Sequence, residues 1–152
     1  MPVLVSSHVR QVIIHDIVVK RLIQQLLVLI RESESEVSIR FVGDTRMRRL
    51  NREYRGNERT TDVLAFAFRE ASGPFSHMLG DVVISIPMAL RQAKSFDHSL
   101  SEELARLLIH GVLHLVGYDH ERSEADARSM KRKEMALWKR VGPIPKLVKG
   151  KF

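Results

Sequence analysis

The sequence predicts an α+β fold in which a small mixed β-sheet packs against helices in a single domain. Segments with alternating apolar residues and segments with helical apolar spacing are intermixed along the 152 residues, without internal repeats. Hydrophobic residues make up 44% of the chain, which is enough for the core of one compact domain. We therefore expect one domain over residues 1–141. The basic segment 142–152 contains Pro and Gly, and we expect it to be a mobile tail.

The first half of the chain combines strand and helix patterns. Leucines spaced about one helical turn apart indicate an amphipathic helix near the N-terminus. Apolar residues alternate from Val37 to Phe41, which indicates a half-buried strand. Asp44 or Thr45 is expected to cap the helix that follows. These patterns predict strands at residues 3–6 and 37–42, and helices at residues 16–30 and 44–54.

The second half of the chain is expected to contain two buried strands followed by three helices. Pro87 suits the first turn of a helix, so it should close the second of these strands. Ser99 or Ser101 should begin a long helix that Gly117 ends, and Ser123 should cap the last helix. The predicted elements are strands at 62–68 and 80–86, a loop at 73–80, and helices at 87–96, 99–116 and 123–140.

The composition excludes several kinds of protein and favours others. The chain has no cysteine, which excludes disulfides, thiolate metal sites and a cysteine nucleophile. The apolar stretch 12–30 contains too many polar residues to span a membrane, and no signal-peptide pattern is visible, so we expect a cytoplasmic protein. The net charge is +7, and basic residues cluster over 46–59 and 131–151. Such charge favours polyanions, chiefly nucleic acid or the ribosome.

Three histidines within eleven residues provide the main indication of function. His110 and His114 are four residues apart, so a helix places both imidazoles on one face, where they can hold one ion. Gly117 can adopt a left-handed conformation that turns the chain back and brings His120 to the same point. Three neutral imidazoles leave a fourth position for water, which is typical of catalytic zinc. We therefore expect one Zn²⁺ per chain, held by His110, His114 and His120.

The histidine spacing also matches the zinc peptidase motif H-E-x-x-H-x-x-G-x-x-H. Those enzymes use the glutamate of the motif as a general base, whereas this chain has Gly111 at that position. The glycine weakens a peptidase function without excluding it. A further alternative is a non-catalytic ribosome-assembly protein with a structural zinc, and the open coordination position counts against it.

Three blocks of the sequence show a family resemblance. They are YRGNERTTDVLAFAF (54–68), LGDVVIS (79–85) and HGVLHLVGYDH (110–120). Together, and in this order, they resemble the YbeY family of bacterial endoribonucleases, also called the rRNA maturation factor family. The resemblance extends from about Val37 to Trp138, and the sequence departs from the family at Ala65 and Ala67, where Ser and Pro are usual.

The resemblance implies a zincin-like fold, zinc on the three histidines, and cleavage of single-stranded RNA. It further implies a role in rRNA maturation, including processing of the 16S rRNA 3′ end, and in ribosome quality control. The arginine of the YRG motif, Arg55, is implied to act in catalysis, and a guanidinium can hold two phosphate oxygens. Arg46, Arg48, Arg49 and Arg52 are expected to give general attraction for the RNA backbone. Expected partners are rRNA and the ribosome or its proteins, with no membrane and no DNA.

The sequence does not identify a general base. Asp119 precedes a candidate ligand and Asp81 lies on a predicted strand, and either could orient an imidazole or cap a turn. Attack on the phosphate by water and attack by the 2′-hydroxyl of the substrate are both compatible with the sequence.

Overall fold

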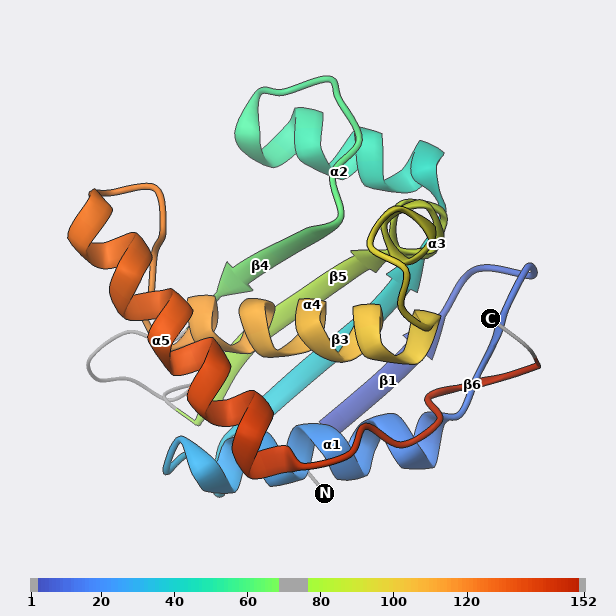
Figure 1. Cartoon of the computed structure of the whole chain (residues 1–152). Helices are drawn as coiled ribbons and strands as arrows, with labels where there is room; N and C mark the ends of the chain where they lie inside the picture. The colour runs from blue at the N-terminus through green and yellow to red at the C-terminus, as the bar shows by residue number, and fades with distance from the viewer. Residues whose placement is uncertain (1–2, 69–76, 151–152) are drawn as a thin grey trace.

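The computed structural model describes residues 3–68 and 77–150 and shows a mixed sheet with helices packed against it (Figure 1). The four strands of the main sheet have the order β1-β3-β5-β4, in which β4 is antiparallel to β5 and the other pairs are parallel. The strands are β1 (Val3–Ser7), β2 (Ile13–Ile14), β3 (Glu36–Val42), β4 (Val63–Ala67), β5 (Met78–Ser85) and β6 (Val148–Lys149). The helices are α1 (Asp16–Leu29), α2 (Asp44–Arg55), α3 (Ile86–Ser95), α4 (Leu100–Leu115) and α5 (Glu124–Val141).

The α+β class is confirmed, and each predicted helix and strand is present with ends shifted by at most two residues. The short antiparallel pair of β2 and β6 was not predicted. Part of the predicted loop at 73–80 lies outside the described residues, and its last residues belong to β5. Within the described ranges, no helix is both long and apolar enough to cross a bilayer.

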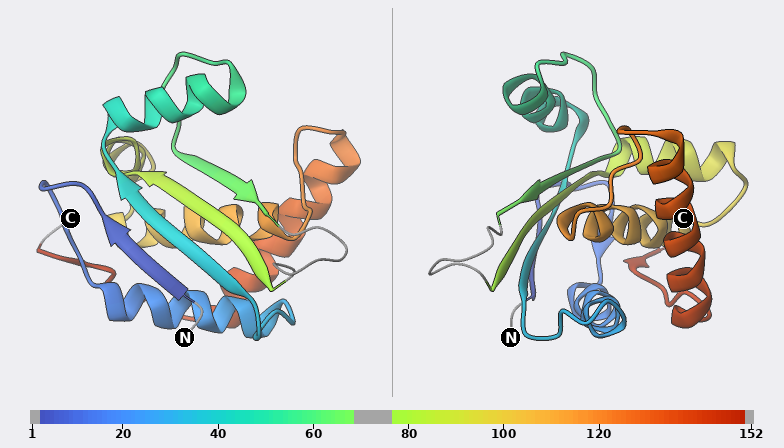
Figure 2. Two further views of the ribbon diagram at one scale, coloured as in Figure 1. Left: turned by 180° about the vertical axis from the view of Figure 1, so that it is seen from behind. Right: turned by 90° about the vertical axis from the view of Figure 1, so that its left-hand side faces the viewer.

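Helix α4 lies across one face of the sheet and contacts β4 and β5 (Figure 1). Leu104, Leu108 and Val112 are spaced along its apolar side and are almost fully buried. Seen from behind, α2 lies over the upper end of the other face of the sheet, and no other helix of the described ranges covers that face (Figure 2). There Met47 of α2 packs with Leu64 of β4 in a small second core. The edge strand β4 therefore lies between α2 on one side and α4 on the other.

The sequence left two alternatives for the N-cap of α4 and two for the N-cap of α2, and the structure shows which residue caps each helix. Ser99 is the N-cap of α4, and its hydroxyl accepts a hydrogen bond of 3.1 Å from the Glu102 N–H. The Glu102 carboxylate accepts one of 3.0 Å from the Ser99 N–H, which completes a capping box. The prediction for α2 is wrong, because Gly43 is its N-cap and neither Asp44 nor Thr45 caps it.

The Asp44 carboxylate instead ties the first turn of α2 to the rest of the fold. It accepts hydrogen bonds of 3.1 Å from the hydroxyls of Thr60 and Ser85 and forms an ion pair of 3.1 Å with Arg91. Burial acts to raise the pKa of Asp44, but the hydrogen bonds and the charge of Arg91 outweigh it and hold the pKa below 3.8. The orientation of α2 relative to β5 and α3 therefore depends on an ionised carboxylate.

The segment after α5 is packed against the domain. Leu147 and Val148 are buried, and β6 pairs with β2. The Leu147 N–H donates to the Ser101 hydroxyl at 2.9 Å, and its carbonyl accepts from the His15 N–H at 2.8 Å. Two buried apolar side chains and a paired backbone thus connect this segment to the domain, and the expected mobility of residues 142–152 stays a prediction.

Candidate metal centre

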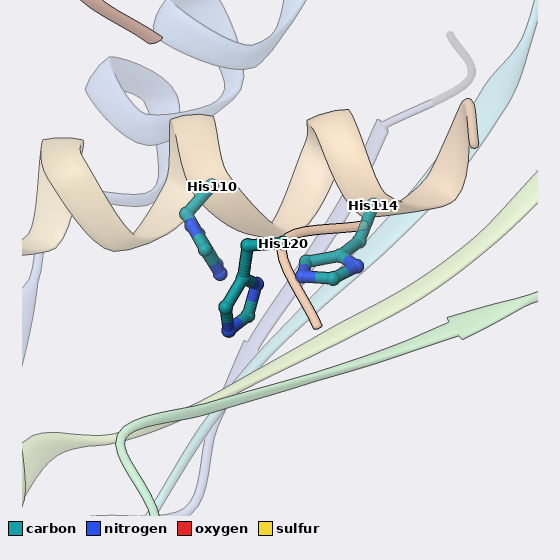
Figure 3. Close-up of side chains that lie close together, drawn as sticks. All are labelled: His110, His114 and His120. Atoms are coloured by element: carbon teal, nitrogen blue, oxygen red, sulfur yellow. The ribbon is translucent and has the colours of Figure 1, made fainter. Parts of the chain in front are cut away.

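Three histidines meet at the C-terminal half of α4 (Figure 3). His110 and His114 project from successive turns of the helix, and His120 comes from the loop that follows. One nitrogen of each ring lies within 4.8 Å of the others, and the ring centroids are 4.8 to 5.3 Å apart. The structure thus brings together the residues that the sequence predicts, in a cluster that could hold one metal ion.

The turn after α4 depends on a glycine. Gly117 has a φ of 106°, which L-residues with a side chain rarely adopt. Its carbonyl accepts a hydrogen bond of 3.0 Å from the Arg122 guanidinium, which connects the turn to the residues that follow His120. The reversal at Gly117 places His120 beside the two helical histidines (Figure 3).

The surroundings of His114 favour a neutral imidazole that can bind a cation. Burial, together with the neighbouring His110 and His120, lowers the pKa of His114 and so favours its neutral, metal-binding form. Nδ1 of His110 lies 3.3 Å from Oε1 of Glu134 on α5, and the two side chains are only 20% and 23% exposed. When Nδ1–H donates to this carboxylate, Nε2 is left free as the ligand atom. Sequence reasoning missed Glu134, because it lies 24 residues from His110 and no spacing rule connects them.

The histidines line a pocket of about 590 Å³ that extends between α4 and the edge strand β4. Figure 3 shows β4 passing on the side to which the imidazoles point. The end of α2 contributes Tyr54 and Arg55, and β4 contributes Phe66. The pocket therefore combines a histidine cluster that could hold a metal ion, cationic side chains and aromatic rings.

Arg55 lines this pocket and forms an ion pair with Glu121, another lining residue. Its Nη2 lies 3.2 Å from Oε1 of Glu121, and the two side chains are 47% and 59% exposed. The same carboxylate oxygen lies 3.8 Å from Nε2 of His120. An exposed pair of this kind adds little stability, so an anion in the pocket can take the place of Glu121 at little cost. The predicted position of Arg55 in the functional site is consistent with this geometry.

The other arginines of α2 lie elsewhere. Arg48, Arg49 and Arg52 border a separate shallow depression on the outer side of the helix. These positions suit general attraction for a polyanion better than contact with the metal cluster.

A second arginine lies in the pocket wall. Arg106 precedes His110 by one helical turn, and its Nε donates to Glu103 at 3.2 Å. Glu103 is fully buried and also lies 2.7 Å from Nε2 of His98. The hydrogen bond with Glu103 raises the pKa of Arg106, which therefore stays charged. Sequence reasoning missed Arg106, although its spacing from His110 places both on one helix face.

Neither of the two aspartates expected to orient an imidazole or cap a turn is hydrogen-bonded to a histidine of the cluster. The Asp119 carboxylate accepts a hydrogen bond of 2.9 Å from the Glu121 N–H, so it caps the turn. Asp81 lines a separate hollow with Glu36 and Ser38 on the other side of the sheet. In the described part of the chain, Glu121 and Glu134 are the carboxylates within 4.0 Å of a ring nitrogen of the cluster.

Gly111 occupies the position of the peptidase glutamate, and the structure shows a steric reason for it. A Cβ at Gly111 would lie 2.6 Å from Cγ1 of Val82 and 3.4 Å from Cγ2 of Val63. A glutamate there would push α4 away from the sheet. The close packing of α4 on β5 therefore counts against a peptidase of this type.

Comparison with known proteins connects this site to one family. The family model described as endoribonuclease YbeY matches residues 6–142. A relative from Pelotomaculum thermopropionicum is 44% identical over 142 residues, covering 88% of this chain and 93% of that protein. One from Desulforamulus reducens is 40% identical over 152 residues, covering 93% and 98%. One from an Anaeromyxobacter species is 50% identical over 120 residues, covering 78% of this chain and 60% of that longer protein.

Each of these relatives is named endoribonuclease YbeY. The fold is also similar to a Thermotoga maritima protein solved in solution, with a TM-score of 0.63 and 24% identity over 91% of this chain and 88% of that one. The match to the family model includes all three histidines and Arg55, and it extends far beyond the blocks that first suggested the resemblance. The chain belongs to the YbeY endoribonuclease family.

Proposed function

We propose that this chain is a zinc-dependent endoribonuclease that cleaves single-stranded RNA during rRNA maturation, including the 16S rRNA 3′ end, and in ribosome quality control. The main support is the pocket in which three imidazoles and an arginine face the same space. Membership of the YbeY family supports RNA as the substrate, and the net charge of +7 supports a polyanionic partner. We place its action in the cytoplasm, on rRNA and the ribosome or its proteins, with no role for DNA or a membrane. Residues 1–141 are the proposed catalytic domain.

His110, His114 and His120 would hold the metal ion. Three nitrogen donors without a thiolate fit zinc, and the open side of the cluster fits a catalytic rather than a structural site. Zinc bound there would supply a water with a pKa of about 7 and would polarise a phosphoryl oxygen. Glu134 would keep the ring of His110 in the tautomer that presents Nε2 to the metal.

Arg55 would bind the phosphate that is cleaved. Its guanidinium can leave Glu121 for two phosphate oxygens, since both side chains are largely exposed. Positive charge at this point stabilises the negative charge that develops on the phosphate oxygens in the transition state. Arg55 comes from α2 and not from the metal cluster, so its role in cleavage is separable from metal binding.

The proposal is tested by single-turnover cleavage of a short single-stranded RNA by zinc-loaded protein. Arg55→Ala should keep its zinc and its melting temperature but cleave about a hundredfold more slowly, because a charge contact to the transition state is lost. Arg55→Lys should recover part of the rate, since an ammonium lacks the bidentate fork. The matched control is Arg49→Ala on the same helix, which should weaken RNA binding slightly and in a salt-dependent manner.

Two results would contradict the proposal. Cleavage by Arg55→Ala at the parental rate would exclude the assigned role of Arg55. Zinc-loaded parent that leaves RNA intact and degrades casein would exclude the endoribonuclease function. Sequencing of rRNA ends from cells that lack the protein would then test whether rRNA is its substrate in the cell.

A further inference from the structure

The pocket contains an exposed aromatic ring that the proposed chemistry does not use. Tyr54 is 65% exposed and lines the pocket together with the histidines. Its ring meets Phe66 of β4 at a centroid distance of 5.0 Å and an interplanar angle of 62°. An edge-to-face contact of this kind orients the Tyr54 ring while leaving much of its surface open to the pocket.

A ring in this position is suited to stack on a nucleobase. Unpaired bases of single-stranded RNA stack on aromatic side chains, and every base has a π-face, so such contacts tolerate different sequences. The ring is already oriented by Phe66, so little conformational freedom is lost when a base binds. The exposed apolar surface of Tyr54 would be covered in the complex.

The position of Tyr54 relative to Arg55 indicates which base it would contact. The two residues are consecutive at the end of α2, and both line the pocket that contains the histidines. A phosphate held at Arg55 therefore places a base of an adjoining nucleotide within reach of Tyr54. The volume of about 590 Å³ suits one small ligand such as a nucleotide, whereas a base inside a duplex has both faces covered by its neighbours.

We propose that Tyr54, oriented by Phe66, forms a subsite for an unpaired nucleobase beside the cleaved phosphate, and that stacking there selects single-stranded RNA. The inference rests on the proposed endoribonuclease function and adds a second contact to the same substrate. A base in a duplex would have to unpair and unstack before it could stack on Tyr54. This step costs free energy, whereas a base in a single strand is already unpaired.

The test compares two probes on protein stripped of metal by a chelator, so that no cleavage occurs. One probe is a fluorescent single-stranded RNA hexamer, and the other is a hexamer of the same ribose-phosphate chain without bases. The parent should bind the hexamer with bases more tightly. Tyr54→Leu should lose about tenfold in affinity for that probe, because one stacking contact is removed. Its affinity for the abasic probe should not change.

Two further variants isolate the stacking contact. Tyr54→Phe keeps the ring without the hydroxyl and should bind both probes like the parent. Phe96→Leu is the matched control, since Phe96 is 63% exposed and lies at the end of α3, away from the residues that line the pocket. This substitution should leave the affinity for both probes unchanged.

The outcomes separate the subsite from the enzymatic function. If the parent cleaves RNA and Tyr54→Leu keeps the same preference for the probe with bases, the subsite alone is overturned. Equal losses in Tyr54→Phe and Tyr54→Leu would assign the effect to the hydroxyl and would also overturn it. A parent that binds neither probe and cleaves no RNA would overturn both proposals.

A second measurement does not depend on the stability of any variant. A hexamer that carries 4-thiouridine can be photocrosslinked to the parent protein and the attachment sites mapped by mass spectrometry. Crosslinks at Tyr54 or Phe66 are expected. Crosslinks confined to other parts of the chain would overturn the subsite.

Discussion

Removal of the Glu134 carboxylate should weaken zinc binding although no ligand is changed. Glu134 lies 3.3 Å from Nδ1 of His110 and holds this ring so that its other nitrogen faces the cluster. Glu134→Ala removes this contact, and Glu134→Gln keeps a weaker, uncharged acceptor. The order of zinc affinity should therefore be parent, then Glu134→Gln, then Glu134→Ala.

The size of the effect follows from the geometry of the contact. Hydrogen bonds that involve a charged group contribute about 1.5–3 kcal/mol. At 3.3 Å, with side chains 20% and 23% exposed, the contact between His110 and Glu134 belongs at the lower end of this range. A loss of about 1.4 kcal/mol corresponds to a factor of about ten in a dissociation constant. We therefore expect zinc affinity to fall about tenfold in Glu134→Ala, which is the smaller end of effects seen for such supporting residues.

The assay is competition for zinc between the protein and a chromophoric chelator at neutral pH, with the fold checked by thermal melting. Glu124→Ala is the matched control, because the Glu124 side chain on the same helix is 95% exposed and its carboxylate lies 4.0 Å from Arg128. Parental zinc affinity in Glu134→Ala would refute the supporting role of the carboxylate. An equal loss in Glu124→Ala would assign the effect to the charge or stability of α5 as a whole.

Three further substitutions test the frame of the site. Gly117→Val should strain a backbone with a φ of 106° by about 1 kcal/mol or more and lower zinc affinity by displacing His120, and unchanged affinity would contradict this. Gly111→Ala should lower the melting temperature, because its Cβ would lie 2.6 Å from Cγ1 of Val82. In a protein that already carries Val82→Ala, Gly111→Ala should cause a smaller loss. An equal loss with and without Val82→Ala would exclude the steric reason. Asp44 has a lowered pKa in the folded state, so its stabilising effect is present above the ordinary value of 3.8 and is lost as the pH falls through the lowered one. Asp44→Asn should therefore be less stable than the parent to urea at pH 7, with a difference that shrinks on acidification, and a difference independent of pH would argue against ionisation as the cause.

The sequence alone determined the features that depend on local spacing. The helices and the four strands of the main sheet follow from apolar periodicity and turn residues, and His110 and His114 face the same way because they are one helical turn apart. The left-handed turn at Gly117 and the approach of His120 also follow from a short segment of chain. The choice between Ser99 and Ser101 as the start of α4 required the structure, since both residue types can cap a helix and only Ser99 forms the full capping box.

The tertiary structure decided which distant residues share the pocket. Glu134 reaches His110 because α5 packs against α4, and Arg55 meets Glu121 because α2 ends above the edge strand β4. Leu147 and Val148 belong to the same buried core cluster as residues of α1, and no pattern in the sequence indicates this contact. Contacts of this kind result from the packing of whole elements, which depends on many weak interactions summed over the fold. Spacing along the chain therefore identified the histidine cluster, whereas packing of whole elements brought Arg55, Glu134 and the aromatic rings to it.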